Sequence, residues 1–554
     1  MRSFAPELLG ADVYPALYRD LSERAERVSA FFPSPPEDRA AWGRRAAAVT
    51  ANWAEDGGSA RRRALVAALT RHHARLGVRP AQQSHLEALG RQDALVVVTG
   101  QQAGLLGGPL YTAYKALGAI VRAAEAQRQL GCPVVPVFWV ASEDHDWSEV
   151  SRAACAAPDG ALVRLRLQGD GGFRSAGHIP LPHEARHLVG RLTSLFPPRG
   201  DGAAAAEALQ ASLQRPGRPT LADWFTTQLQ SLFGEAGLLF YDPMLPDLRA
   251  LAAPVFSGAV ERAPAANAAI VSAGEALAMA GYEPGLELEP DHVHLFAYHQ
   301  GRRVALHAVD GRVRTRDGAV DLEARAAARL AAAEPAGFSP NVALRPIVQA
   351  FTLPVLCQLG GPGEVAYLAQ LGGVFSLWGL EAPIVAPRPG ATILLPADVD
   401  ALAAAGAPVL SLRSDLEGMI DRAVAARCPV DIADVFAAER RALAERYGQL
   451  RTVLAAVGPA MPVIVDGNAE RVTHQLDYLE RKARQHRRRT QRELAASLRA
   501  AAGRLFPAGG LQERSSLIYP YLFSEGPGFL AALREVLAAV PGPIGRHWLL
   551  RWEP

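Results

Sequence analysis

The fold of this chain is decided by residues 94–115, which read ALVVVTGQQAGLLGGPLYTAYK. The apolar run 94–98 predicts a buried strand, and the pattern from Leu110 onward predicts a helix. Glycines in the intervening turn let the backbone bend sharply and approach a ligand closely. Free backbone N–H groups and the helix dipole at such a corner favour a phosphate or carboxylate. The spacing fits neither the G-x-x-x-x-G-K-[ST] motif nor a clean G-x-G-x-x-G motif.

Lys115 closes this segment and is one of only two lysines, the other being Lys482, among 58 basic residues. In so arginine-rich a chain, a lysine indicates a position that needs a compact ammonium, such as one facing a phosphate. A chance lysine on a helix surface is the alternative. The residues of this corner that we expect to bind substrate or nucleotide are Thr99, Gly100, Gln101, Gln102, Gly104, Gly107, Gly108, Tyr111 and Lys115.

The composition is that of a globular protein with several domains. A chain of 554 residues, 49% hydrophobic and 21% charged, is expected to fold into two to four domains. Its net charge of +2 creates no field that calls for nucleic acid or an acidic membrane. The amino terminus lacks the apolar segment of a signal peptide, and no apolar run approaches the length of a membrane span. We therefore expect a cytoplasmic protein with neither nucleic acid nor membrane as its partner.

The cysteines give no sign of a disulfide framework or a zinc site. Four are present, widely scattered and without a C-x-x-C pair: Cys132, Cys155, Cys357 and Cys428. We expect small buried hydrophobic side chains at these positions.

Apolar and helical patterns alternate through the first two thirds of the chain. A strand at 95–99, a helix at 110–130 and a strand at 134–141 form a βαβ unit, which predicts an α/β fold with a parallel sheet. Further core strands are expected at 237–241, 353–358 and 382–388, a helix at 221–232, period-two alternation at 162–167, and a hairpin at 292–307. The expected domains are a helical segment of the core at 1–90, the core at 91–394 with insertions near 155–185 and 260–335, a coiled-coil domain at 395–505, and a segment at 506–554 that packs back on the core.

The coiled-coil expectation rests on two long, charged, alanine-rich helical patterns at 434–457 and 469–505. Helices of this length and polarity do not fit inside a compact core, so an antiparallel arm is the natural interpretation. The basic run 481–489 is interpreted as a solvated helix face, with nucleic-acid binding as the weaker alternative.

An acidic cluster follows the strand at 134–141. Ligands bind beyond the carboxyl ends of parallel strands, and a group of three carboxylates and an imidazole can take a proton, hold an ammonium or bind a metal. A capped, solvated loop is the alternative. The catalytic residues that we expect are Glu143, Asp144, His145 and Asp146, with no metal ligand assigned.

A second glycine turn, LGGPGE at 359–364, again follows a strand and opens a helix. It could accept an anion or a close backbone approach, or it could be a structural turn. Two arginines near this turn could hold a carboxylate or phosphate in bidentate fashion, although each alone is more often a structural ion pair. The binding residues expected here are Gly361, Gly363, Glu364, Arg345 and Arg388.

Three segments, 99–111, 137–146 and 360–367, together resemble the cysteine-adding enzymes of bacillithiol biosynthesis, the BshC family. Their order and spacing, and the total length, match over nearly the whole chain. The resemblance implies a Rossmann-like parallel-sheet core with inserted connecting segments, and a coiled coil that pairs two subunits. It also implies a ligase that joins L-cysteine to glucosaminyl-malate through an amide.

Amide formation from a free carboxylate is uphill in water, so ATP or another nucleotide is expected to activate cysteine, and Mg²⁺ could accompany it. The first glycine corner and Lys115 would stabilise an anionic group, residues 143–146 would orient and deprotonate the amine, and Arg345 or Arg388 would hold malate. These groups are expected to meet at one rim of the sheet. Two alternatives stay open: another nucleotide-dependent ligase or transferase on a class I synthetase-like fold, and a coiled-coil scaffold protein.

Overall fold

The computed structural model describes residues 3–9, 13–55, 57–214, 216–427, 430–540 and 545–553, so that Cys428 lies outside the described residues. The chain folds into two compact units. The first, called here the core unit, comprises Met1–Cys155, Val163–Ile393 and Leu511–Pro554. The second, the arm unit, comprises Ala156–Leu162 and Leu394–Gly510.

A five-stranded parallel sheet of order β13-β12-β2-β3-β6 lies within the core unit. Its strands are β2 (Leu95–Gln102), β3 (Val134–Ala141), β6 (Leu239–Tyr241), β12 (Val355–Gly360) and β13 (Ile384–Pro387). Parallel strands covered on both faces have continuous apolar sequences, and β3 is buried along its whole length. The predicted α/β class is therefore confirmed.

Helix α5 (Leu110–Leu130) connects β2 to β3 and has the predicted bounds. It begins after Pro109 and ends at Gly131, whose φ of 68° is the left-handed conformation that commonly closes a helix. The register of β2 on β3 runs from Leu95 opposite Val134 to Gln102 opposite Ala141. The two strands therefore end level with each other, and both open onto the same edge of the sheet.

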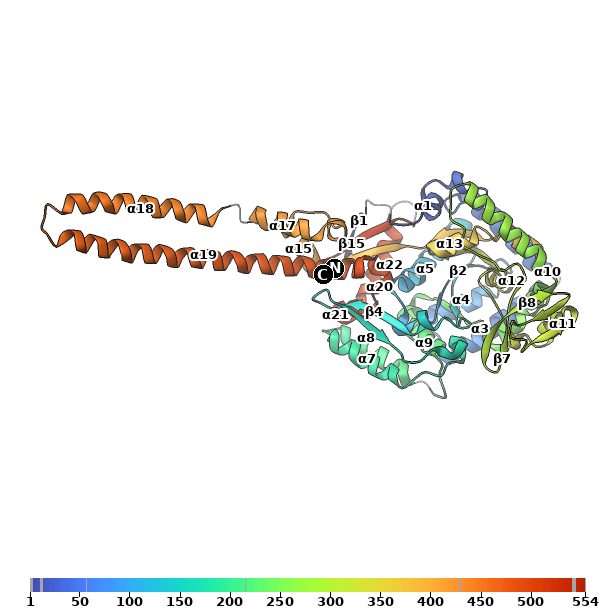
Figure 1. The fold of residues 1–554 in the computed structure, drawn as a ribbon. Coiled ribbons are helices and arrows are strands. Elements are labelled where there is room, and N and C mark those ends of the chain that lie inside the picture. Colours follow the sequence, from blue (N-terminus) through green and yellow to red (C-terminus); the bar gives the residue numbers. More distant parts are fainter. Residues whose placement is uncertain are drawn as a thin grey trace. The chain divides into compact units, whose positions relative to one another are not determined.

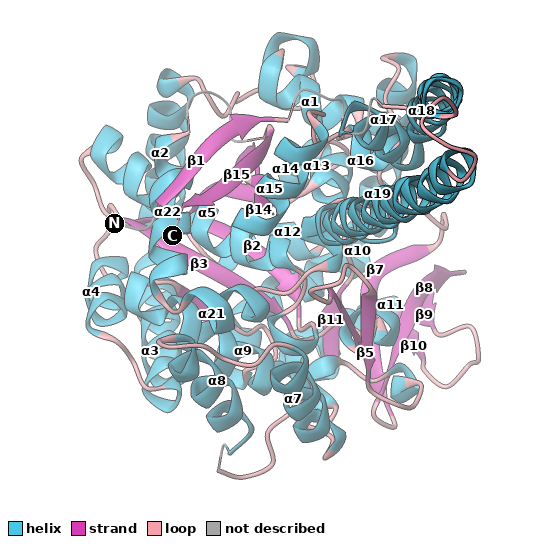
Figure 2. Cartoon of the chain, turned by 90° about the vertical axis from the view of Figure 1, so that its left-hand side faces the viewer, coloured by secondary structure: helices cyan, strands magenta, loops and turns pink. Residues whose placement is uncertain are grey.

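Helices surround this sheet (Figure 2). Those from the first 90 residues are α1 (Ala16–Glu23), α2 (Arg39–Ala54), α3 (Gly58–Leu76) and α4 (Pro80–Leu89). Later ones include α9 (Leu221–Phe233), α10 (Pro246–Met279), α12 (Arg345–Thr352), α13 (Pro362–Leu368) and α14 (Gly372–Leu377). None of the helices formed by the described residues is long and apolar enough to cross a membrane.

The predicted hairpin belongs to an antiparallel sheet of order β10-β9-β8-β7-β11. Its turn residues, Gln300 and Gly301, both have positive φ, as a two-residue hairpin of type I′ requires. The strands are β7 (His292–His299), β8 (Arg302–Val309), β9 (Arg312–Arg314), β10 (Asp321–Glu323) and β11 (Phe338–Pro340). The alternating stretch at 162–167 also forms a strand, β5 (Leu162–Arg166), which pairs with β4 (Arg152–Ala156).

The two ends of the chain meet in a three-stranded sheet of order β1-β15-β14. Strand β1 (Ser3–Leu8) pairs antiparallel with β15 (His547–Glu553), next to β14 (Gly390–Leu394). The sequence predicts only helices before residue 90, so that β1 was not expected. An edge position explains how this strand accommodates Pro6, which cannot donate a hydrogen bond.

The arm unit contains two long helices, α18 (Ile432–Leu454) and α19 (Met461–Leu505), which lie side by side (Figure 1). They are antiparallel, because Arg440 pairs with Asp477 while the later Arg451 pairs with the earlier Asp466. The same unit holds α15 (Pro396–Ala405), α16 (Ser411–Ser414) and α17 (Leu416–Arg427).

Within the basic run 481–489, Arg484 pairs with Glu480 and Arg489 pairs with Glu493, each one turn away on α19. This pairing is typical of a solvated helix face. In the core unit, Cys155 and Cys357 are buried free thiols, as expected, whereas Cys132 is half-buried.

Candidate active site

A cavity of about 390 Å³ lies at the carboxyl ends of β2, β3 and β12. It is built around the edge of the sheet where the Rossmann-like topology places ligands. Ten of the residues predicted to bind line it: Gly100, Gln101, Gln102, Tyr111, Lys115, Arg345, Gly361, Gly363, Glu364 and Arg388.

Lys115 lines this cavity with 4% of its side chain exposed. Its ammonium donates to the Gly100 carbonyl at 2.7 Å and to Gln101 Oε1 at 2.9 Å, and it lies 2.5 Å from Glu364 Oε2. All three N–H donors of the ammonium therefore have a partner. Burial lowers the pKa of Lys115, and the Glu364 carboxylate opposes that shift. This lysine ties the end of β2 to the start of α13 and is not a chance surface residue.

The second glycine turn lies at the cavity. Glu364 reaches back to the start of α13, where its Oε2 accepts from the Gly361 backbone N–H at 2.7 Å. That bond holds the turn so that Gly361 and Gly363 both line the cavity. Glu364 therefore has a structural role, because its carboxylate is bonded both to Lys115 and to the start of its own helix.

The first glycine corner is only partly at the cavity. Gly104, Gly107 and Gly108 do not line it, and neither does Thr99, whose hydroxyl donates to the Leu359 carbonyl on β12.

Protein atoms occupy the space over these glycines. Gly107 and Gly108 have φ of 78° and 76°, and a Cβ on Gly108 would lie 2.7 Å from Thr112 Oγ1. At the start of α5, the Leu110 backbone N–H already donates to the Ser516 carbonyl at 2.7 Å. These contacts indicate that Gly108 serves close packing at the start of α5.

Arg388 is buried and its guanidinium is held by Glu513. The bonds are 2.6 Å from Nη2 to Oε1 and 3.1 Å from Nη1 to Oε2, and the two side chains are 2% and 0% exposed. Arg388 also lies over the Tyr111 ring, 5.2 Å from its centroid. The charge of Arg388 is therefore already neutralised on the protein side.

Arg345 is different, because among the described residues no carboxylate lies within 4 Å of its guanidinium. Its Nη2 donates to the Tyr367 hydroxyl at 3.1 Å. It stands at the start of α12 and faces the cavity, so its charge is available to a ligand.

None of the four residues expected to be catalytic, Glu143, Asp144, His145 and Asp146, lines the cavity. Glu143 is buried beside Arg249 at 3.3 Å, and burial raises the pKa of Glu143 despite that arginine. Asp146 caps the short helix α6 (Trp147–Val150) by accepting from backbone N–H groups.

Asp144 contacts Gln102, which lines the cavity, whereas His145 contacts Arg303, which does not. Asp144 Oδ2 accepts from Gln102 Nε2 at 2.7 Å, and Arg303 donates to His145 Nδ1 at 2.9 Å. Burial would raise the pKa of Asp144, but Arg303 and the Gln102 bond outweigh it and hold that pKa below its usual range. Burial and Arg303 together lower the pKa of His145, so its imidazole is neutral.

The matches to known families cover the chain. The model for "Bacillithiol biosynthesis BshC, N-terminal Rossmann-like domain" matches residues 9–389, and that for the BshC C-terminal coiled-coil domain matches residues 391–550. The chain belongs to the BshC family.

Curated members of the BshC family align over most of their length. A protein of Desulforamulus reducens is 33% identical over 82% of this chain and 84% of its own. One of Symbiobacterium thermophilum is 33% identical over 85% and 87%, and one of Salinibacter ruber is 32% identical over 96% and 95%. Each carries the name "Putative cysteine ligase BshC".

Two charged residues of this BshC-family cavity escaped the sequence analysis. Glu149, on α6, accepts from Gln101 Nε2 at 2.9 Å, and Arg514 enters from the carboxyl-terminal segment. The acid cap at Asp146 three residues earlier was a local signal for Glu149. Arg514 had none, because nearly 400 residues separate it from Lys115. Gln349, Gln358 and Tyr367 also line the cavity.

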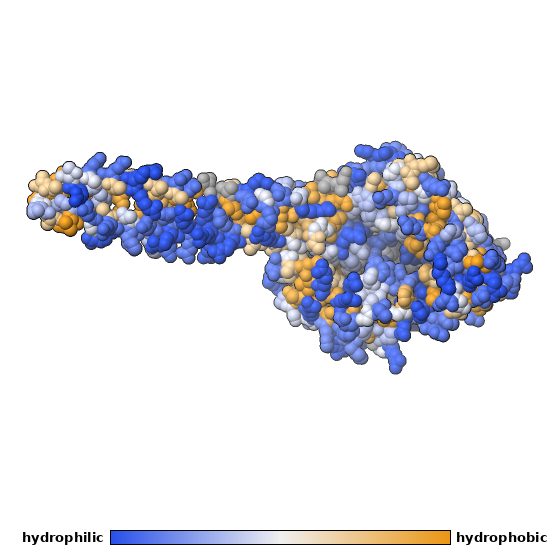
Figure 3. All heavy atoms as spheres, viewed as in Figure 1, coloured by the Kyte–Doolittle hydropathy of each residue, from blue (hydrophilic) through white to orange (hydrophobic). Residues whose placement is uncertain are grey.

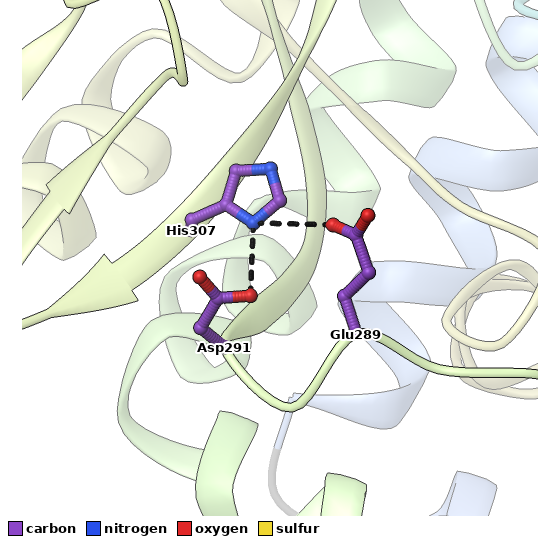
Figure 4. Close-up of side chains that lie close together, drawn as sticks. All are labelled: Glu289, Asp291 and His307. Carbon is purple, nitrogen blue, oxygen red and sulfur yellow. Dashed lines mark hydrogen bonds and ion pairs between the residues drawn. The ribbon is translucent and has the colours of Figure 1, made fainter.

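One group among the described residues has metal-ligand geometry, and it lies outside the cavity lining. The ligand atoms of Glu289, Asp291 and His307 all lie within 4.8 Å of one another (Figure 4). His307 Nδ1 is 3.1 Å from Asp291, while Glu289 is bound by Arg316 at 2.6 Å. Because a guanidinium already neutralises Glu289, we interpret this group as an ion-pair network that ties β8 to the loop before β7.

Proposed function

We propose that this chain is a cysteine ligase that joins L-cysteine to glucosaminyl-malate through an amide, forming bacillithiol. The observation that carries the proposal is the cationic cavity at the carboxyl ends of β2, β3 and β12, in a chain that matches both BshC domain models. An enzyme that consumes free cysteine and a nucleotide would work in the cytoplasm.

Two guanidiniums of the cavity suit the malate part of the substrate. Neither Arg345 nor Arg514 has a carboxylate within 4 Å among the described residues, and both line the cavity. Guanidinium and carboxylate form strong bidentate hydrogen bonds. We assign the malate carboxylates to Arg345 and Arg514. Arg388 lines the cavity but is already paired with Glu513.

Activation of the cysteine carboxyl requires a co-substrate, and we propose ATP together with Mg²⁺. We assign no side chain of the cavity to its phosphates, since the three donors of Lys115 already have partners and Arg345 and Arg514 are assigned to malate. The nucleotide would supply a phosphate leaving group on the cysteine carbonyl.

We further propose that the protein is a homodimer that pairs through α18 and α19. Apolar side chains stand exposed toward the turn between these helices, at 68% for Val453, 71% for Val457, 73% for Val463 and 57% for Ile464. Figure 3 shows hydrophobic atoms at that end of the arm. Sedimentation velocity should give twice the chain mass, and Val463→Lys should shift the protein toward monomer.

The ligase proposal is tested by incubating the purified protein with cysteine, glucosaminyl-malate and Mg·ATP and measuring bacillithiol by mass spectrometry. We expect product only when all three substrates are present. Arg345→Met should raise the KM for glucosaminyl-malate at least tenfold, because one bidentate charge pair is lost. Absence of product with the wild-type protein, or equal product with another amine acceptor, would overturn the assignment.

A further inference from the structure

Only two carboxylates line the cavity among the described residues, Glu149 and Glu364. The Glu364 carboxylate already has two partners, the Lys115 ammonium and the Gly361 backbone N–H. It cannot accept a proton without breaking its ion pair with Lys115, which joins α5 to α13. The other carboxylate is therefore the one that remains available to a ligand.

Glu149 is held in place but is not neutralised. Its Oε1 accepts one neutral hydrogen bond from Gln101 Nε2 at 2.9 Å. No arginine or lysine lies within ion-pair distance of it in the described part of the chain. A carboxylate that is oriented by an amide and faces a cavity can receive a proton from a bound ligand.

The acidic cluster of the sequence positions this residue. Asp144 Oδ1 accepts from the backbone N–H groups of His145 and Asp146, which makes the turn after β3. Asp146 Oδ1 then accepts from the backbone N–H groups of Ser148 and Glu149, which caps α6. These bonds fix the backbone from which the Glu149 side chain enters the cavity.

The electrostatic surroundings favour a proton on this carboxyl more than on an ordinary glutamate. Burial, and after it the charges of Asp144 and Asp146, raise the pKa of Glu149, while Lys115 opposes them. A carboxyl whose pKa moves toward neutrality is a stronger base for an ammonium than an unperturbed one.

We propose that Glu149 is the catalytic base that deprotonates the amine of the acceptor before it attacks the activated cysteine. The inference rests on the proposed function. The Glu149 carboxylate takes one proton from the glucosamine ammonium, and the freed lone pair attacks the cysteinyl carbonyl carbon. The C–N bond forms and the bond from that carbon to the phosphate oxygen breaks, its electron pair leaving with the phosphate. The second nitrogen proton leaves with the phosphate or to water, and Glu149 returns its proton to water through the cavity.

The test compares Glu149→Gln with the wild-type enzyme in the complete reaction with Mg·ATP from pH 5.5 to 9. Glutamine keeps the shape and the bond to Gln101 but cannot accept the proton. General-base catalysis contributes about 10²- to 10⁴-fold, so kcat should fall at least about 100-fold, with each KM changed by less than about threefold. The acidic limb that Glu149 sets in the wild-type kcat profile should be lost, and the residual rate of the variant should instead follow the fraction of free amine as the pH rises.

Glu184→Gln is the matched control, since this exposed carboxyl in the first turn of α7 (Glu184–Leu195) does not line the cavity. It should keep wild-type kcat. If Glu149→Gln unfolds below the assay temperature, Glu149→Asp carries the test, with a reduced kcat and a displaced acidic limb expected.

An unchanged kcat in a folded Glu149 variant, or a loss confined to KM, would overturn the role of Glu149 and leave the ligase assignment standing. A wild-type enzyme that makes no bacillithiol would instead defeat the proposed function.

Discussion

The buried pair of Arg388 and Glu513 provides the sharpest energetic prediction, and the perturbation is Glu513→Gln. Both side chains are almost fully buried, and their bidentate contact is joined by the Tyr14 hydroxyl and the Ala391 backbone N–H, which donate to the same carboxylate. Replacing the charge with an amide leaves the Arg388 guanidinium buried without a counter-charge. Removing one partner from such a pair costs about 3–5 kcal/mol of unfolding free energy.

The pH dependence of this cost has a definite sign. Burial alone would raise the pKa of Glu513, but Arg388 outweighs it and holds that pKa below its usual range. A depressed carboxyl pKa contributes stability that is complete above the unfolded pKa, near 4.3, and is lost as the pH falls through the folded value. The difference between wild type and Glu513→Gln should thus be constant from pH 6 to 8 and shrink at pH values below about 4.

The measurement is urea unfolding followed by tryptophan fluorescence at pH 7 and at acidic pH. Asp93→Asn is the control, because it breaks another bidentate arginine–carboxylate pair, with Arg91, that lies at the surface. That change should cost less than about 1 kcal/mol. If Glu513→Gln cost no more than this control at pH 7, the buried pair would not hold Arg388 as we describe.

Three further predictions concern the cavity and its supports. Lys115→Met should lower the unfolding free energy by about 3 kcal/mol in urea titration, because it leaves the Glu364 carboxylate unpaired. An unchanged unfolding midpoint would contradict the view that Lys115 stabilises the contact between β2 and α13. Asp146→Ala should reduce bacillithiol formation several-fold, whereas Asp146→Asn should not, since asparagine also caps a helix. Equal losses of activity in the two variants would show that Asp146 itself transfers a proton. Gly108→Ala should lower the unfolding free energy by about 1–3 kcal/mol in calorimetry, because the residue has a positive φ and the added methyl group overpacks the site. Gly190→Ala, where a Cβ meets open space, should leave the unfolding free energy unchanged or raise it. Equal losses in the two variants would refute the packing role of Gly108.

Much of the fold was predictable because local sequence patterns mark where its helices and strands begin and end. The bounds of α5 and β3 were correct, since Pro109 and Gly131 delimit the helix and β3 is apolar throughout. Strand β1 was missed because only Phe4 is buried within it, so its sequence carries no alternation. Its partner β15 lies more than 500 residues away, and no local pattern could reveal that pairing.

The candidate site was predictable where a glycine-rich turn and a charged side chain of the cavity belong to the same short segment. Lys115 and Glu364 come from two separate glycine-rich segments, and both line the cavity. Glycine spacing could not distinguish a ligand approach from close packing: Gly107, where a Cβ would lie 3.6 Å from Tyr519, does not line the cavity. Arg514 could not be found, because only the folded chain brings the carboxyl-terminal segment to the sheet edge.

The charges that remain in the cavity after its internal pairs are removed match the proposed acceptor. Lys115 is neutralised by Glu364, and Arg388 by Glu513, so these pairs leave no net charge for a ligand. Arg345 and Arg514 then provide two positive charges, and Glu149 provides one negative charge. Glucosaminyl-malate carries two carboxylates and one ammonium, which is the complementary set. With a carboxylate on each guanidinium, the ammonium is the group left to pair with Glu149, and the contact that we propose for binding the acceptor would also remove its proton.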